Sequence, residues 1–79
     1  MHFINTATQI GATLTGRRKH LKLSQTEVAN RLGLSQNRLS ELEANPETLT
    51  VEQLLALLNV LGLEIAVGER TGSKTKVEW

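Results

Sequence analysis

The stretch SQTEVANRLGLSQNRLSELE, residues 24–43, decides the fold of this chain. Ser24 and Glu27 have the S-x-x-E spacing of a capping box, so a helix is expected to begin directly after Ser24. Gly33 can adopt the left-handed conformation that ends a helix, and Ser35 is placed to cap a second one. The stretch therefore predicts two short helices joined by a tight turn.

Apolar residues recur in this stretch at the positions that a shared buried face needs: Val28, Leu32, Leu34, Leu39 and Leu42. Ala29 is small enough to let two helix backbones cross closely. This pattern indicates a helix-turn-helix, whose second helix is presented to the major groove of DNA. The alternative is an ordinary helical hairpin that binds nothing.

Polar side chains fill the expected outer face of the second helix, and we expect them to contact bases: Gln36, Asn37, Arg38 and Ser40. Amide and guanidinium groups of this kind bond base edges bidentately. A capping box that began at Ser35 would place Glu or Gln at position 38, yet the chain has Arg38 there. An arginine at this point binds a phosphate or reaches a guanine edge.

These residues resemble the phage-repressor-like helix-turn-helix family (Cro/repressor, often called XRE). The resemblance implies that Gln25, which opens the first motif helix, holds a backbone phosphate. It also implies that Gln36, Asn37 and Arg38, the first exposed residues of the recognition helix, read bases.

The chain before this stretch predicts another helix, capped by Thr6 and Gln9 and ending at about Leu21. Basic residues cluster at its C-terminal end: Arg17, Arg18, Lys19 and Lys22. The phosphate contacts that we expect are Gln25, Arg18, Ser35 and Arg17. For the basic cluster, the alternative is a solvated helix end, and for Arg18 an internal role as well.

A fourth helix is expected after the loop 45–49, with Thr50 and Gln53 as its capping box. Its apolar residues are Val51, Leu54, Leu55, Leu57, Leu58 and Leu61. They cover an arc of roughly 160°, which is wider than the roughly 100° stripe that faces a single core. We therefore expect part of this helix, including Leu55, to meet a second subunit, although clamping on two sides within one subunit would also explain the arc.

Residues 62–68 alternate as a strand does, with Leu63, Ile65 and Val67 on one face. A lone strand leaves its backbone groups unpaired, so we expect it to pair with the same strand of a second copy in a two-fold homodimer. The dimer would place the recognition helices roughly 34 Å apart, to fit a palindromic site. The alternative is an extended segment packed on the helices of its own subunit.

The sequence predicts a mainly α fold of four helices in one domain over residues 1–69, followed by a flexible tail over residues 70–79. Trp79 ends the chain and would anchor in a partner's pocket, fold back on its own domain or do nothing. Charge is polarised, because residues 1–38 carry six Lys or Arg against one Glu and residues 39–79 carry three against seven.

Composition argues against an enzyme and against a membrane protein. The chain has no Cys, only two His, no Gly-rich phosphate loop and no metal-ligand spacing, so we expect no cofactor, no metal and no small-molecule substrate. No apolar run approaches the roughly twenty residues of a membrane span. A soluble protein of the bacterial cytoplasm is expected.

The layout as a whole resembles the HipB group of antitoxins: an N-terminal helix, SQTEVANRLGLSQNRLSELEANP, a Leu-rich helix, one strand and a tail ending in Glu78-Trp79. The resemblance implies a homodimer that represses its own operon by binding double-stranded operator DNA, and that binds a HipA-like Ser/Thr kinase toxin. Two alternatives stay open, a stand-alone regulator without a toxin and a protein-interaction module with vestigial DNA binding.

Overall fold

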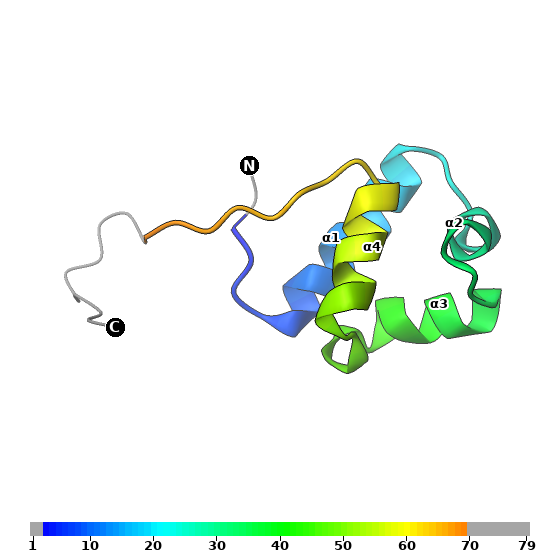
Figure 1. Ribbon diagram of the computed structural model, residues 1–79, viewed down its shortest axis with the longest axis horizontal. Coiled ribbons are helices and arrows are strands. Elements are labelled where there is room, and N and C mark those ends of the chain that lie inside the picture. Colours follow the sequence, from blue (N-terminus) through cyan, green and yellow to red (C-terminus); the bar gives the residue numbers. More distant parts are fainter. Residues whose placement is uncertain (1–2, 70–79) are drawn as a thin grey trace.

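The computed structural model describes residues 3–69 of the chain, which fold as a small bundle of helices (Figure 1). In chain order the elements are α1 (Ala7–His20), α2 (Gln25–Leu32), α3 (Gln36–Ala44), the short 3-10 helix η1 (Pro46–Thr48) and α4 (Val51–Val60). The mainly α, four-helix fold expected from the sequence is confirmed. None of these helices is long and apolar enough to cross a membrane.

Each helix begins where its capping residue predicts. Thr6, Ser24 and Thr50 form reciprocal capping boxes. The hydroxyl of each accepts from the backbone N–H three residues later, and the Gln or Glu side chain at that later position accepts from the backbone N–H of the capping residue. Ser35 caps α3 from one side only, because its hydroxyl accepts from the backbone N–H of Arg38 while the Arg38 side chain cannot reciprocate. The four start points were therefore readable from sequence.

Within residues 3–69, three turns use the left-handed backbone conformation, at Lys22, Gly33 and Gly62. Gly33 ends α2 with φ of 70°, as expected from the sequence, and this conformation costs a residue with a side chain about 1–2 kcal/mol. Lys22, in the connection between α1 and α2, has φ of 59° and bears that cost without being glycine. The turn before the helix-turn-helix is therefore mildly strained.

The core lies where α1, α2, α3 and α4 converge. Its fully buried apolar residues are Leu14, Val28, Ala29, Leu39, Leu42, Leu57 and Leu61, each at most 1% exposed. Helix α3 contacts α1, α2 and η1, while α2 also contacts α4, so α2 and α3 are held against the rest of the bundle rather than only against each other. Ala29 is completely buried, in keeping with the close approach expected of it.

Gly11 permits a close approach between α1 and the end of α3. A Cβ atom at this position would lie 2.8 Å from the carbonyl oxygen of Glu43 and 3.0 Å from Cγ of Pro46. The absence of a side chain thus lets α1 lie directly against the end of α3 and the start of η1. Gly16, on the same helix, has no atom within 4 Å of the equivalent position.

After Gly62 the chain is extended: Leu63 still packs against the core, and the segment that follows it, up to Glu69, leads away from the helices (Figure 1). Within residues 3–69 this segment has no strand partner. The strand expected over residues 62–68 needs a second copy for its hydrogen bonds, so it stays a prediction. The tail over residues 70–79, with Trp79, lies outside the described residues.

Candidate nucleic-acid interface

Helix α3 runs along one edge of the bundle, with an inner and an outer face (Figure 1). Leu39 and Leu42 are 0% exposed and hold the inner face in the core. The expected base-contacting residues lie around the rest of the helix: Gln36 and Asn37 are exposed, and Arg38 and Ser40 are half-buried. The structure therefore brings these four residues together on one surface helix.

The N-terminal ends of α2 and α3 are joined through two glutamine side chains. Nε2 of Gln36 donates to Oε1 of Gln25 at 2.6 Å. Nε2 of Gln25 in turn donates to Oε1 of Glu43 at 3.1 Å. Gln25, an expected phosphate contact, and Gln36, an expected base contact, thus belong to one hydrogen-bond network.

Glu43, near the end of α3, is the centre of this network. Its carboxylate accepts from Arg18 Nε at 2.8 Å and Nη2 at 3.2 Å, from Thr15 Oγ1 at 3.3 Å and from Gln25. Burial alone would raise the pKa of Glu43, but the hydrogen bonds from Arg18 and Gln25 outweigh it and leave the pKa below its ordinary value. The network therefore holds a charged carboxylate against α1 and α2.

Arg18 has an internal role, and this corrects the phosphate contact expected of it. Its side chain is 11% exposed. Two of its nitrogens bind Glu43, and Nη1 donates to the carbonyl oxygen of Leu23 at 3.0 Å. A guanidinium engaged in this way inside the bundle cannot reach a phosphate without breaking the pair, so the internal alternative holds for Arg18.

The side chain of Arg17, another expected phosphate contact, is also engaged within the bundle. Its Nε donates to the carbonyl oxygen of Leu61, at the end of α4, at 2.9 Å. Nη2 lies close to Gly62, 3.5 Å from where a Cβ would stand. The side chain is therefore directed towards the C-terminal end of α4 and not towards α3, where its cation also suits the helix dipole. Of the expected phosphate contacts, Gln25 and Ser35 are the two placed at the N-terminal ends of the motif helices.

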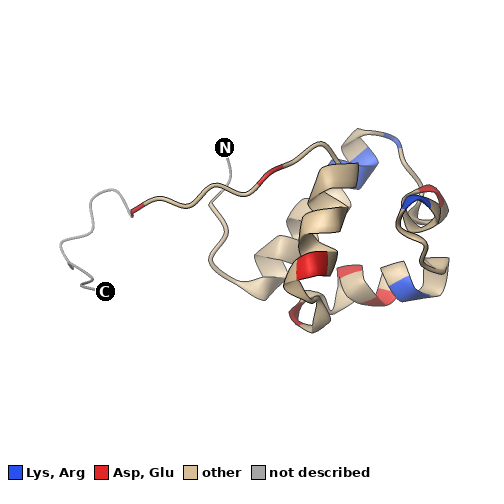
Figure 2. Ribbon diagram, in the orientation of Figure 1, with Lys and Arg blue, Asp and Glu red and all other residues tan. Residues whose placement is uncertain are grey.

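The net charge of the α3 side chains is negative, whereas binding to phosphates favours a positive charge. The charged residues of α3 are Arg38, Glu41 and Glu43, so acidic side chains outnumber basic ones. Figure 2 shows both colours of charge on this helix. Exposed basic residues lie on other elements instead, at the end of α1, in the following turn and on α2: Lys19, Lys22 and Arg31. Electrostatic attraction for DNA would thus come from the elements that flank α3.

Sequence reasoning missed two parts of this surface. No local pattern connects Glu43 with Arg18, which is 25 residues away, so only the folded chain discloses that pair. Glu41 was also passed over, although its spacing of three from Arg38 was a usable signal. The structure pairs them, with Nη1 of Arg38 3.2 Å from Oε2 of Glu41.

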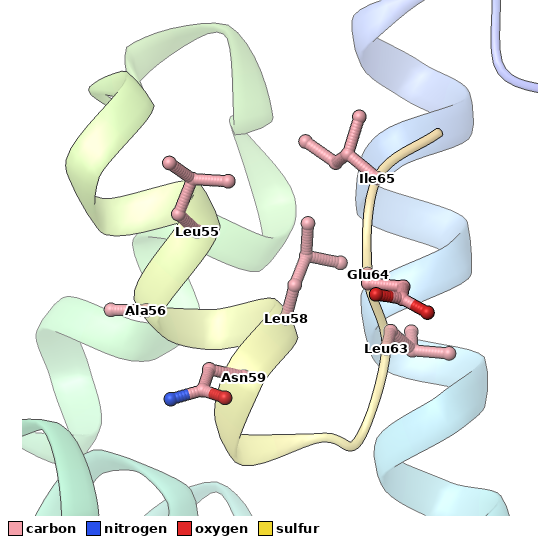
Figure 3. A pocket seen from close by; sticks show the side chains of 7 residues that line it. All are labelled: Leu55, Ala56, Leu58, Asn59, Leu63, Glu64 and Ile65. Carbon is pink, nitrogen blue, oxygen red and sulfur yellow. The ribbon is translucent and has the colours of Figure 1, made fainter. Parts of the chain in front are cut away.

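The residues expected at the dimer contact lie away from α3. Leu55, Ile65 and Val67 are 49%, 52% and 96% exposed, large values for apolar side chains. Figure 3 shows Leu55, Leu58 and Ile65 facing a common space between α4 and the extended segment. This hollow, about 430 Å³ in volume, is lined by Leu63 as well. Of the four expected residues, Leu55, Leu63 and Ile65 therefore border one hollow on the single chain, whereas Val67 does not line it.

Comparison with known proteins identifies the motif independently of the geometry. A family described as helix-turn-helix matches residues 16–67. The ImmF control region 10 kDa protein of Bacillus phage phi105 is 36% identical over 55 residues, which are 66% of this chain and 61% of that protein. The chain thus spans less than two thirds of this relative's length.

Solved structures agree on the fold. A chain of the HipA-HipB-O2-O3 complex matches with a TM-score of 0.82 and 24% identity, over 90% of this chain and all of the other. The structure of an MDT protein matches with the same TM-score, identity and coverage. Taken with α2 and α3, the family match means that this chain belongs to the helix-turn-helix family and is a DNA-binding protein of repressor-like fold.

Proposed function

We propose that the protein is a sequence-specific transcriptional repressor that binds a palindromic operator as a homodimer and serves as the antitoxin of a toxin–antitoxin module. The observation that carries the DNA-binding part is the hydrogen bond between Gln25 and Gln36. It orients two amide groups at the exposed N-terminal ends of the motif helices before any ligand arrives. Pre-orientation lowers the entropy lost on binding.

In this proposal the helix N-termini and the outer face of α3 have different tasks. Gln25 and Ser35, which lie at the helix N-termini, hold phosphate oxygens and set the register on the duplex. Gln36, Asn37, Arg38 and Ser40 then contact base edges in the major groove. Support comes from the inner face of α3, where Leu39 and Leu42 are fully buried and leave no freedom for the helix to rotate.

The homodimer is proposed from the apolar surface of the single chain. Leu63, Ile65 and Val67 of two copies would pair as an antiparallel ribbon over residues 62–68, with Leu55 of α4 beneath it. Pairing would satisfy the backbone groups of the extended segment and cover side chains that are half or more exposed in one copy. Two recognition helices roughly 34 Å apart would then meet successive turns of one duplex face.

The antitoxin role is supported by likeness of fold. The matched chain belongs to a HipA-HipB-O2-O3 complex. We propose that this protein likewise binds a HipA-like Ser/Thr kinase toxin in the bacterial cytoplasm, and that Trp79 contributes to that contact. A stand-alone helix-turn-helix regulator is the second candidate, favoured by the similarity to a protein of a phage control region.

Co-purification and DNA binding together test this proposal. The tagged full-length protein is expressed with the product of the neighbouring reading frame, and the complex is tested by gel shift on the DNA upstream of both. We expect the protein and its neighbour's product to purify as a stable complex, and this complex to shift the upstream DNA specifically. An Arg38→Ala variant should weaken the specific shift by about 1–3 kcal/mol, whereas Thr8→Ala, at an exposed position on α1, should not.

The outcomes distinguish the proposed DNA binding from the proposed toxin binding. A specific shift without a co-purifying protein would leave the repressor and remove the antitoxin role. A co-purifying protein without any specific shift would instead indicate an interaction module, and the DNA-reading proposal would be lost.

A further inference from the structure

Glu41 lies nearer to the middle of the outer face of α3 than Arg38 does. At 100° per residue, the direction opposite the buried Leu39 and Leu42 points within about 10° of Asn37. Glu41 lies roughly 50° from that direction, and Arg38 roughly 110° from it. The side chain of Glu41 is 65% exposed, against 43% for Arg38. Around the helix axis, the carboxylate of Glu41 therefore lies between Asn37 and Arg38, two residues that we expect to read bases.

The ion pair between Arg38 and Glu41 contributes little to the helix itself. Exposed ion pairs of this kind add little to stability, because water screens the two charges and the side chains lose freedom when they pair. Its orientation also opposes the helix dipole, because the cation is in the first turn of α3 and the anion in the last. Helix stability would favour the reverse order, so stability does not account for the two residues.

A carboxylate on this face also carries a cost for DNA binding, because it repels phosphates. One base offers compensation: cytosine presents an exocyclic amine in the major groove, and Glu accepts a hydrogen bond from it. Its partner guanine presents two acceptors, N7 and O6, which arginine binds. A G·C pair thus displays acceptors and a donor side by side.

We propose that Glu41 is a specificity-determining residue, and that Arg38 and Glu41 read one G·C pair together as a donor–acceptor unit. The pair uses Nη1 of Arg38 and Oε2 of Glu41. The remaining N–H groups of the guanidinium are the donors for guanine O6 and N7, and Oε1 of Glu41, which no other residue of 3–69 binds, is the acceptor for cytosine N4. This inference rests on the proposed DNA binding and names the base pair selected.

Selection from a pool of randomised duplexes tests it, followed by fluorescence anisotropy on the selected duplex and on its single base-pair changes. The wild type should prefer G·C at one position of each half-site by roughly tenfold or more. Glu41→Gln should change the preference there towards A·T, since glutamine reads adenine bidentately. Glu41→Ala should reduce the preference by roughly tenfold, while both variants keep the wild-type preference at every other position.

Glu69→Gln is the matched control, since it removes the same charge from an exposed position outside α3 and should leave every preference unchanged. Thermal unfolding by circular dichroism checks that the variants are folded. If both Glu41 variants bind all duplexes more tightly but with unchanged base preferences, Glu41 is only a repulsive charge and the inference is wrong. If the wild type itself discriminates among no duplexes, the proposed DNA reading fails first and this inference falls with it.

Discussion

The side chains of Gln25 and Gln36 are hydrogen-bonded to each other, Nε2 of Gln36 donating to Oε1 of Gln25 at 2.6 Å. The same Gln25 amide donates to Glu43, which is paired with the buried Arg18. The first residue of the recognition helix is thus connected, through the first residue of the preceding helix, to an ion pair in the interior. A surface amide at the reading end of α3 is held by contacts that begin inside the bundle.

Gln25→Ala should weaken specific DNA binding without unfolding the protein. The change removes a proposed phosphate contact and releases the Gln36 amide from its fixed orientation, so we expect a loss of about 1–2 kcal/mol. Anisotropy titration on the operator measures it. Thr26→Ala, the exposed neighbour on α2, is the control and should bind as the wild type does. Equal affinity of the Gln25 variant would count against pre-orientation.

Glu43→Gln should destabilise the protein at neutral pH by about 3 kcal/mol, because it leaves the buried Arg18 without its counter-ion. Urea unfolding measures this free energy. Glu47→Gln, an exposed acid on η1, should be nearly neutral. A Glu43 variant as stable as the wild type would mean that the ion pair does not anchor α3.

Acid should unfold the wild type in part through the same carboxylate. The pKa of Glu43 is lowered from 4.5, so the folded state binds fewer protons than the unfolded state around that pH. Its contribution is therefore complete above about pH 4.5 and is lost as the pH falls through the lower, folded-state pKa. Free energies of unfolding measured between pH 7 and pH 3 should decline less steeply for Glu43→Gln. A smaller decline remains from Glu27, whose pKa is lowered by hydrogen bonds from Ser24.

Gly11→Ala and Gly16→Ala should change stability in opposite directions although both lie in α1. At Gly11 a methyl group would meet the backbone of Glu43 at 2.8 Å, so α1 must move and we expect a loss of about 1–3 kcal/mol. At Gly16 nothing lies within 4 Å, and alanine should gain about 0.5–1 kcal/mol from helix propensity. Thermal denaturation of the two variants measures both changes in stability. A stabilising Gly11→Ala would contradict the close approach of α1 to the end of α3.

Ile65→Lys should shift the proposed dimer towards monomer, because it buries a charge in the ribbon. Ala66→Lys faces the opposite side of a strand and should leave the dimer intact. Analytical ultracentrifugation at several concentrations measures both. Monomers from both variants, or from neither, would mean that the dimer contact lies elsewhere. Weaker operator binding by Ile65→Lys should accompany dissociation, since one half-site alone binds poorly.

Deleting residues 70–79 should spare the dimer and DNA binding but weaken capture of the toxin partner. Trp79 supplies the large apolar side chain that interfaces favour, and the deletion removes it. Pull-down of the co-expressed partner measures the loss, with Trp79→Ala as the narrower variant. A truncated protein that no longer dimerises would place the subunit contact in the tail instead of in residues 62–68.

The sequence by itself determined where the helices begin and which face of each is buried. These properties depend on residues three or four positions apart, as with Ser24 and Glu27 at the start of α2 or Leu39 and Leu42 inside α3. Contacts at such short spacing are set by backbone geometry, so they could be predicted without the fold. The exposed row that opens α3 followed from the same periodicity.

Only the tertiary structure decided what the charged residues do. Arg17 and Arg18 are neighbours in a basic cluster, yet one caps α4 and the other pairs with Glu43 inside the bundle. Their directions differ because adjacent helical residues point about 100° apart, and which element each one meets depends on how α1 crosses α3 and α4. That crossing is set by side-chain volume at positions such as Gly11, which is long-range packing that no local pattern encodes.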